Sequence, residues 1–340
     1  MRYRPRDREL AIELSLELLA TGRVRGIPLG HSPEDLERLL GPPACEGILE
    51  FSGNLLRDWG LLEAYYEREY PAATWRGTLF MGQLHRMPKP LKWKLIAREL
   101  RNLGYEVMPE AMPTLDDNYF RVYESGAGAV VFGTGNAPDR MRGHIAKISS
   151  AERLSMGRPS DAFSFNAIHR TVHAAVTGPE NDWNRWLGRQ ARPHAEWYEL
   201  AHGAIHLVVD EHPERIHQAT TFHDWLLSQA DAAQVWSGVE RALLYARCVA
   251  GDASREPLPA RPGVPSADQI IGGCLALLPL SRESARSLPT DWRTIEPSDV
   301  RRCRVTRTLV LAANALRDRA TAPNLIAELT AWHDVLPDIC

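Results

Sequence analysis

The kind of secondary-structure signal changes once along this chain, near residue 155. Residues 1–155 mix amphipathic helical segments with short strand-like runs, whereas residues 156–340 carry helical periodicity alone. The junction "SSAERLSMGRPSD" is polar and rich in helix and strand breakers. A chain of 340 residues also exceeds the size of one ordinary core. We therefore predict an α+β domain over 1–155 followed by an all-α helical domain over 156–340.

Within the N-terminal domain the order of elements recurs. Ser32, Pro33 and Asp35 have the types and spacing of an N-cap, a first helical position and a capping-box partner, which predicts a helix that Gly41 ends. A second amphipathic helix, "LKWKLIARELRNLG", ends at Gly104. The strand-like runs follow these helices in two groups, at 47–51, 60–66 and 75–85, and within 119–125, 129–133 and 143–149. The order, not the identity, of these elements fits a repeated α-β-β-β unit with antiparallel strands.

Composition and charge narrow the class of protein. With 44% hydrophobic and 24% charged residues, the chain is expected to fold as an ordinary globular protein. A net charge of −3 gives no reason to expect a nucleic-acid partner or a membrane surface. The sequence contains no apolar run near 18 residues, and no secretory signal follows its basic start. The five scattered cysteines form no Cys-x-x-Cys pair, which argues against a disulfide framework and favours a cytoplasmic location.

Four histidines fall within residues 199–217, "ELAHGAIHLVVDEHPERIH". On one helix over 194–211, Glu199, His202 and His206 share a face, as ligands on a single helix must. The polar, solvated side of an amphipathic helix looks the same and is the preferred interpretation, with no cofactor. A zinc site of the His-Glu-x-x-His kind is excluded, because Gly203 stands where the general base would be.

The alternative interpretation is a divalent-metal enzyme in the helical domain. A second His-x-x-x-His pair, His169 and His173, lies on a helix that could pack against the first. The ligands of this alternative are Glu199, His202, His206, His169 and His173. A di-iron centre would also need carboxylates from two further helices, which the sequence does not identify.

Acidic residues dominate the stretch from Glu34 to Glu69, with nine carboxylates against three basic residues. If these carboxylates share one surface, they could steer a basic protein partner towards it. The alternation in "GLLEAYYERE" would place Glu63 and Glu67 on one strand face. The candidate partner-binding residues are Glu34, Asp35, Glu37, Glu63 and Glu67. The other interpretation is that these are ordinary solvated residues whose charges are balanced in three dimensions.

Three segments of the N-terminal domain, "GIPLGHSPEDLERLLGPP", "LLRDWGLLEAYYE" and "WRGTLFMGQLHRM", carry a resemblance. They resemble actinobacterial immunity-type proteins of polymorphic toxin systems over about sixty residues, and the helical domain is not covered. The resemblance implies a non-enzymatic, cytoplasmic protein that neutralises a partner toxin by binding it directly. A metal-dependent enzyme and a structural scaffold are the competing classes.

Overall fold

The computed structural model describes most of the chain. The described residues are 5–50, 53–68, 75–87, 89–110, 118–133, 139–151, 165–178, 183, 195–229, 237–250, 263–289 and 291–335. The chain divides into two compact units. Unit 1 comprises Met1–Arg153, Leu280–Arg304 and Val335–Cys340, and unit 2 comprises Leu154–Pro279 and Val305–Asp334. The sequence pattern had placed all residues after 155 in the helical domain, so the return of Leu280–Arg304 to unit 1 was not expected. Whether the units fold independently stays a prediction.

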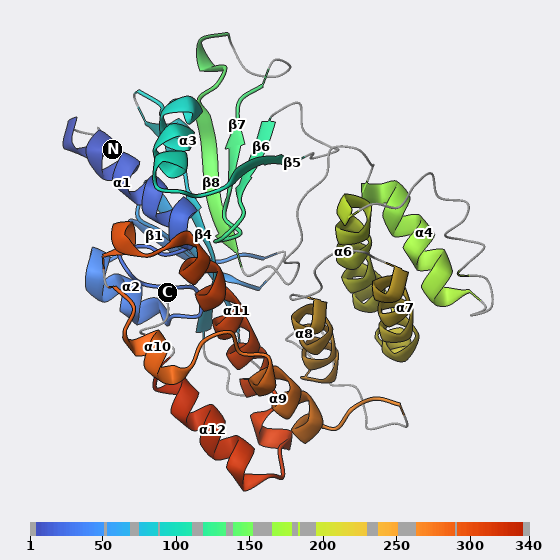
Figure 1. The fold of residues 1–340 in the computed structure, drawn as a ribbon. Coiled ribbons are helices and arrows are strands. Elements are labelled where there is room, and N and C mark those ends of the chain that lie inside the picture. The colour runs from blue at the N-terminus through green and yellow to red at the C-terminus, as the bar shows by residue number, and fades with distance from the viewer. Residues whose placement is uncertain are drawn as a thin grey trace. The chain divides into compact units, whose positions relative to one another are not determined.

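Unit 1 is built on one eight-stranded sheet in which every neighbouring pair is antiparallel (Figure 1). The order across the sheet is β1-β2-β3-β4-β8-β7-β6-β5. The strands are β1 (Cys45–Ile48), β2 (Leu55–Asp58), β3 (Leu62–Arg68), β4 (Trp75–Gly82), β5 (Val107–Glu110), β6 (Asn118–Val122), β7 (Gly128–Val131) and β8 (Ile145–Ala151). A short 3₁₀ turn, η1 (Leu84–Arg86), follows β4, and another, η2 (Asp139–Met141), lies between β7 and β8.

The sheet consists of two equivalent halves. Helix α2 (Pro33–Leu40) precedes β1 to β4, and helix α3 (Trp93–Asn102) precedes β5 to β8, so the halves meet at the β4–β8 pair. The fold class predicted from the sequence, α+β followed by helices, is confirmed. The repeat, however, has four strands rather than three, because β2 and β5 were missed. Each of these strands has only four residues, too few to show a clear alternation.

Local sequence explains where the helices of unit 1 begin and end. Helix α1 (Pro5–Thr21) stops where Gly22 adopts a φ of 76°, a conformation that glycine tolerates best. Helix α2 begins with the expected capping box, since a carboxylate oxygen of Asp35 accepts from both the backbone N and the hydroxyl of Ser32 at 3.0 Å. Helix α3 buries Trp93, Ile96 and Leu100 at helical spacing.

Unit 1 is completed by residues from late in the sequence. These are α10 (Arg282–Arg286), η5 (Trp292–Thr294) and the first part of α11 (Pro297–Asn314). The guanidinium of Arg301 lies 4.1 Å from the ring centroid of Tyr123, a cation–π contact. The division between the two units falls within α11, between Arg304 and Val305.

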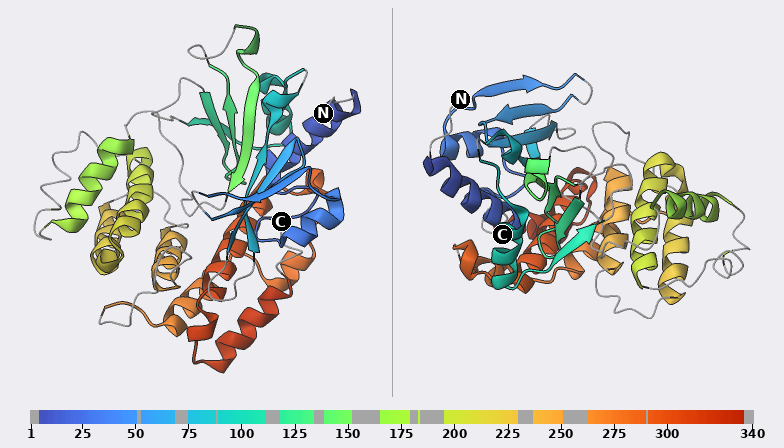
Figure 2. Two further views of the ribbon diagram at one scale, coloured as in Figure 1. Left: turned by 180° about the vertical axis from the view of Figure 1, so that it is seen from behind. Right: turned by 90° about the horizontal axis from the view of Figure 1, so that it is seen from above.

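Every secondary-structure element that the structure describes in unit 2 is a helix (Figure 2). Its helices are α4 (Phe165–Thr177), α6 (Ala195–Glu211), η4 (Pro213–Arg215), α7 (Ile216–Gln229), α8 (Ser237–Ala250), α9 (Ala267–Ala276), the rest of α11, η6 (Arg317–Arg319) and α12 (Pro323–His333). Its core gathers buried aliphatic and aromatic side chains from these helices, including Val172, Ile205, Phe222, Leu243 and Leu309. Such burial is the main term that stabilises the unit.

No helix among the described residues is long and apolar enough to cross a membrane. Among the described cysteines, Cys303 is disulfide-bonded, whereas Cys45, Cys248 and Cys274 are free thiols. The disulfide weakens the argument that this chain belongs in a reducing compartment.

Candidate metal centre

Two helices of unit 2 bring histidines together at one point. Helix α4 buries Ile168, Val172 and Val176 in the core of the unit, which leaves His169 and His173, one turn apart, at the margin of that core. Helix α6 packs against α4 and ends at Glu211. The next residue, His212, precedes Pro213 and is the N-cap of η4. The chain therefore turns at the place where the side chains of Glu211 and His212 can face α4.

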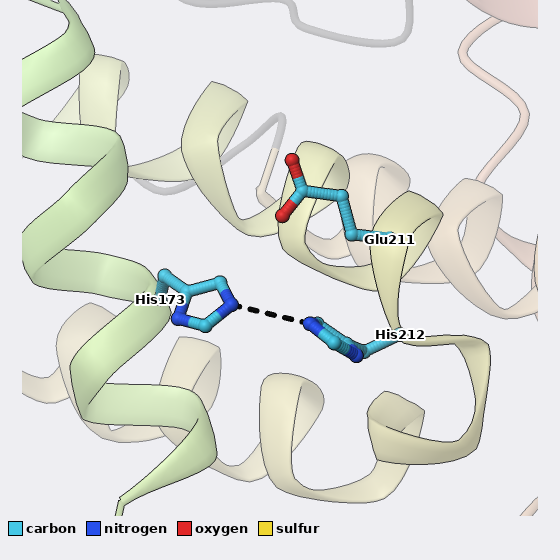
Figure 3. A group of neighbouring side chains, drawn as sticks. All are labelled: His173, Glu211 and His212. Atoms are coloured by element: carbon cyan, nitrogen blue, oxygen red, sulfur yellow. Dashed lines mark hydrogen bonds between the residues drawn. The ribbon is translucent and has the colours of Figure 1, made fainter.

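The closest approach in this cluster joins two imidazole rings. Nε2 of His173 lies 3.2 Å from Nε2 of His212, and the pair is drawn with Glu211 in Figure 3. One ligand atom from each of His173, Glu211 and His212 lies within 4.8 Å of the others. The three residues could thus offer two nitrogens and one carboxylate oxygen to one ion.

The separation of the two nitrogens matches the requirement of a tetrahedral metal ion. Zinc binds histidine nitrogens at about 2.0–2.1 Å, so two such ligands on a tetrahedron lie about 3.3 Å apart. Imidazole and carboxylate are also ligands that zinc accepts. The same 3.2 Å separation is compatible with a hydrogen bond in which one neutral ring donates to the other.

Neighbouring groups orient the possible ligands. Oε1 of Glu214 lies 3.4 Å from Nδ1 of His212. A carboxylate at Nδ1 favours the tautomer that carries its proton there, and this leaves the lone pair of Nε2 directed towards the site. On the other side, Nε2 of His169 lies 3.7 Å from Oε1 of Glu211. Two residues outside the three-residue cluster therefore lie beside its possible ligands, Glu214 beside His212 and His169 beside Glu211.

The position of the cluster also suits a cation. Glu211 is the last residue of α6, and the C-terminal end of a helix carries a partial negative charge. The side chains of Glu211 and Glu214 are about half exposed, so an ion can reach them from solvent. His173 and His212 are half-buried, which limits competition from bulk water at the two nitrogens.

The metal ligands predicted from the sequence are only partly brought together. His173 belongs to the cluster and His169 adjoins it, but Glu211 and His212 were not predicted as ligands. His206 is buried at 9% exposure, so the interpretation of its helix face as solvated is wrong at this residue. Glu199 and His202 lie on α6, and their side chains fall outside the described part of the structure. The signal for the missed pair was the dipeptide Glu-His directly before a helix-ending proline.

The predicted partner surface needs one correction. Glu63 is buried at 5% exposure, and its carboxylate accepts hydrogen bonds from Nε2 of Gln83 at 2.7 Å and from the hydroxyl of Tyr65 at 2.9 Å. It cannot take part in an exposed acidic surface. Glu67, four residues on, is exposed. The register of β3 with β4 shifts between Tyr65 and Tyr66, which disturbs the alternation on which the prediction relied.

The remaining carboxylates of this group differ in their surroundings. Glu34 is exposed, whereas Glu37 pairs with Arg57 at 2.9 Å. Asp35 accepts from Ser32 and pairs with Arg38 at 3.1 Å. Burial raises the pKa of Asp35, but the hydrogen bonds from Ser32 and Arg38 outweigh it and hold the pKa below its usual value. Part of the acidic stretch is thus neutralised within the chain.

Comparisons with known proteins add no family to this geometry. No family model matches the chain, and neither the curated proteins nor the solved structures contain a match. The resemblance to immunity-type proteins therefore remains a proposal, and the chain is placed by its own geometry alone: an α+β unit with an eight-stranded antiparallel sheet, and a helical unit with a histidine–glutamate cluster.

Proposed function

We propose that the helical unit binds one Zn²⁺ ion through His173, His212 and Glu211. The observation that carries this proposal is the 3.2 Å separation of the two Nε2 atoms, which is close to the ligand spacing of a tetrahedral zinc ion. The carboxylate of Glu211 supplies a third ligand of opposite charge to the ion. Glu214 supports the tautomer of His212 that binds metal.

The test is metal uptake by the full chain. Protein stripped by a chelator is titrated with ZnCl₂ in a calorimeter, and we expect one ion per chain. His173→Gln and His212→Gln each remove a nitrogen ligand and should abolish tight binding. His217→Gln is the matched control, because His217 is an exposed histidine on α7 outside the cluster.

Two results would count against zinc binding. One is a wild-type chain that takes up no zinc, in which case the His173–His212 contact is only a hydrogen bond between neutral rings. The other is a loss in His217→Gln as large as that in His212→Gln, which would mean that surface histidines bind zinc unspecifically.

A second candidate function is protein binding of immunity type through unit 1. Strand β1 lies at one end of the sheet order, and all four of its residues are exposed. Ile48 exposes 55% of its surface, and Glu34 on α2 is an exposed carboxylate, whereas Glu46 on β1 pairs with Arg57. An edge strand with an exposed apolar side chain favours an added strand, and the exposed carboxylate of Glu34 favours a basic partner. The partner we propose is a basic protein, a toxin in the immunity interpretation, met in the cytoplasm.

This candidate is tested by affinity capture from cells of the source organism. The tagged wild-type chain should retain a basic protein in stoichiometric amount, and Ile48→Lys should lose it because like charges and a polar side chain then face the partner. His217→Gln should retain the same protein. If the wild-type chain and Ile48→Lys retain the same proteins, β1 is not the docking strand.

A further inference from the structure

Unit 1 carries its charge unevenly. The chain as a whole has a net charge of −3, which gave no reason to expect a nucleic-acid partner. Residues 84–104 and 139–151 nevertheless contain nine Lys and Arg residues against two carboxylates, those of Glu99 and Asp139. The acidic residues that offset these cations lie in other parts of the sequence, so the two segments are strongly basic by themselves.

The fold brings the two basic segments together. Lys92, the N-cap of α3, is paired with His144 in an isolated antiparallel bridge. The backbone N–H of Trp93 donates a hydrogen bond of 2.9 Å to the carbonyl of Gly143. The beginning of α3 therefore lies against the residues that lead into β8, although the two segments are far apart in the sequence.

The cations of these segments are exposed. Lys94, Arg98 and Arg101 lie at positions i, i+4 and i+7 of α3, so they share one face of the helix. Arg98 pairs with Glu99 at 3.2 Å, whereas Lys94 and Arg101 have no carboxylate partner in the described part of the structure. We define the basic surface by its exposed cations, which are Lys92, Lys94, Arg98 and Arg101 of α3 and its N-cap, and Arg140 and Arg142 of the adjoining segment.

The cations at the beginning of α3 are not placed to stabilise the helix. The N-terminal end of a helix carries a partial positive charge and is stabilised by acidic side chains. Helix α3 has no acidic residue in its first turn, and Lys92 and Lys94 lie there instead. A local arrangement that opposes the stability of its own helix is typical of a functional surface.

The composition of the basic surface suits a phosphate backbone better than a protein or a lipid surface. Protein interfaces rely on apolar and aromatic anchors and are depleted in lysine, and helices that bind at a membrane surface insert apolar side chains. None of the exposed large hydrophobic residues of the described structure belongs to the two basic segments; they are Leu10, Leu39, Ile48, Leu207 and Leu277. Trp93 is buried, so its ring is not offered to an unpaired base for stacking. Contacts from Lys and Arg to phosphates need none of these features.

We propose that the basic surface of unit 1 binds the phosphate backbone of a double-stranded nucleic acid. Lys94 and Arg101 are seven residues apart, or about 10 Å along α3. That length spans about three phosphates of one strand, which follow one another every 3.4 Å or so along a duplex. Contacts of this kind do not read bases, so binding is independent of sequence and depends strongly on salt. This activity goes beyond the proposed zinc site, whose residues belong to unit 2.

The test is the fluorescence anisotropy of labelled duplexes titrated with the full chain. The NaCl concentration is varied between about 50 and 200 mM, with a chelator present so that zinc plays no part. Each phosphate contact contributes about 0.9 to the slope of log affinity against log salt concentration, so the four cations of α3 and its N-cap predict a slope of about −3.6 or steeper. Two duplexes of different sequence should bind equally well, and DNA and RNA duplexes of equal length distinguish the two sources of the backbone.

A pair of double variants locates the binding surface. Lys94→Gln with Arg101→Gln removes two phosphate contacts, so the slope should become shallower by about 2 and binding should weaken by more than about 10-fold at 100 mM NaCl or so. Arg170→Gln with Arg286→Gln is the matched control, because it removes the same charge from two exposed residues outside the basic surface. The control variant should keep the slope and the affinity of the wild-type chain.

The outcomes that overturn the proposal are specific. One is a wild-type chain that binds no duplex at about 50 mM NaCl, and another is an equal loss of affinity in the two double variants. Tighter binding to a single strand of the same length, to polyglutamate or to vesicles of anionic lipid would assign the surface to a different partner. If Lys94→Gln with Arg101→Gln fails to fold, the wild-type slope still decides, because a slope shallower than about −2 is too small for the four cations.

Discussion

The indole N–H of Trp292 donates a hydrogen bond of 3.2 Å to the carboxylate of Glu13, from which it is separated by 279 residues. Arg293 pairs with the same carboxylate. Glu13 lies on α1, the first helix of unit 1, and Trp292 lies on η5 with only 8% of its surface exposed. The contact explains why Leu280–Arg304 belongs to unit 1 although helices of unit 2 precede it in the sequence.

We expect Trp292 to stabilise unit 1 more by burial than by its hydrogen bond. Trp292→Ala should lower the free energy of unfolding by about 3–5 kcal/mol, because a large buried ring is removed. Trp292→Phe keeps most of the apolar area and should cost about 1–2 kcal/mol, mainly the hydrogen bond to Glu13. Urea unfolding measures both. Glu9→Gln, a change at an exposed residue of α1, the helix that carries Glu13, is the control. Equal losses of stability in Trp292→Ala and Trp292→Phe would contradict this ranking.

The capping box of α2 should make stability depend on pH. Asp35→Ala removes the acceptor of two hydrogen bonds from Ser32 and should cost about 0.3–1.5 kcal/mol at pH 7. The pKa of Asp35 is lowered in the folded chain, so its contribution is fully present above the unfolded-state pKa of about 4 and is lost as the pH falls through the lower folded value. The difference between wild type and variant, measured by urea unfolding from pH 7 to pH 2, should therefore shrink below about pH 4.

Glu34→Ala is the matched control for Asp35→Ala, because Glu34 is exposed in the same helical turn. It should change stability by less than about 0.5 kcal/mol. A penalty for Asp35→Ala that stays constant down to pH 2 would show that the carboxylate charge does not matter to the capping box.

The elements that the sequence predicted well are those whose signals are local. Gly22 and the Ser32–Asp35 capping box mark helix ends through the conformation and hydrogen bonds of a few residues. Strands β2 ("LLRD") and β5 ("VMPE") were missed because each has only four residues. Charged or proline side chains among them make the sequence look like that of a loop. Their strand character depends on pairing with neighbours far along the chain, which a local pattern does not record.

The metal cluster was predicted in part because a local pattern marks only His173 among its three residues. The His-x-x-x-His pair of α4 follows from helical spacing. Glu211 and His212 become ligands only through the end of α6 at Pro213 and the packing of α6 on α4. His206 shows the opposite error, since its place on a polar helix face suggested solvent although the packed helices bury it. Tertiary contacts decide both cases.

Two carboxylates of β3 should respond differently to charge reversal. In the wild-type chain, the amide of Gln83 and the hydroxyl of Tyr65 both donate hydrogen bonds to the carboxylate of Glu63. Glu63→Lys replaces this acceptor with an ammonium group, so a buried positive charge is left without a suitable partner. We expect a loss of about 3–5 kcal/mol in stability. Glu67→Lys changes an exposed residue and should stay within about 0.5 kcal/mol. Urea unfolding of both variants is the measurement, and equal stabilities would mean that Glu63 is accessible to solvent after all.

Zinc should raise the thermal stability of the helical unit if His173 and His212 bind it. An ion that binds only the folded chain stabilises it by about 2.7 kcal/mol at a concentration one hundred times its dissociation constant. For a unit of this size, each kcal/mol shifts the unfolding midpoint by about 2–4 °C, so the expected rise is about 5–10 °C. Differential scanning calorimetry with and without ZnCl₂ measures it. His212→Gln should abolish the rise and His217→Gln should keep it, because the first removes a nitrogen of the cluster and the second an exposed ring outside it. A rise of the same size in His212→Gln would place the stabilising ion elsewhere on the chain.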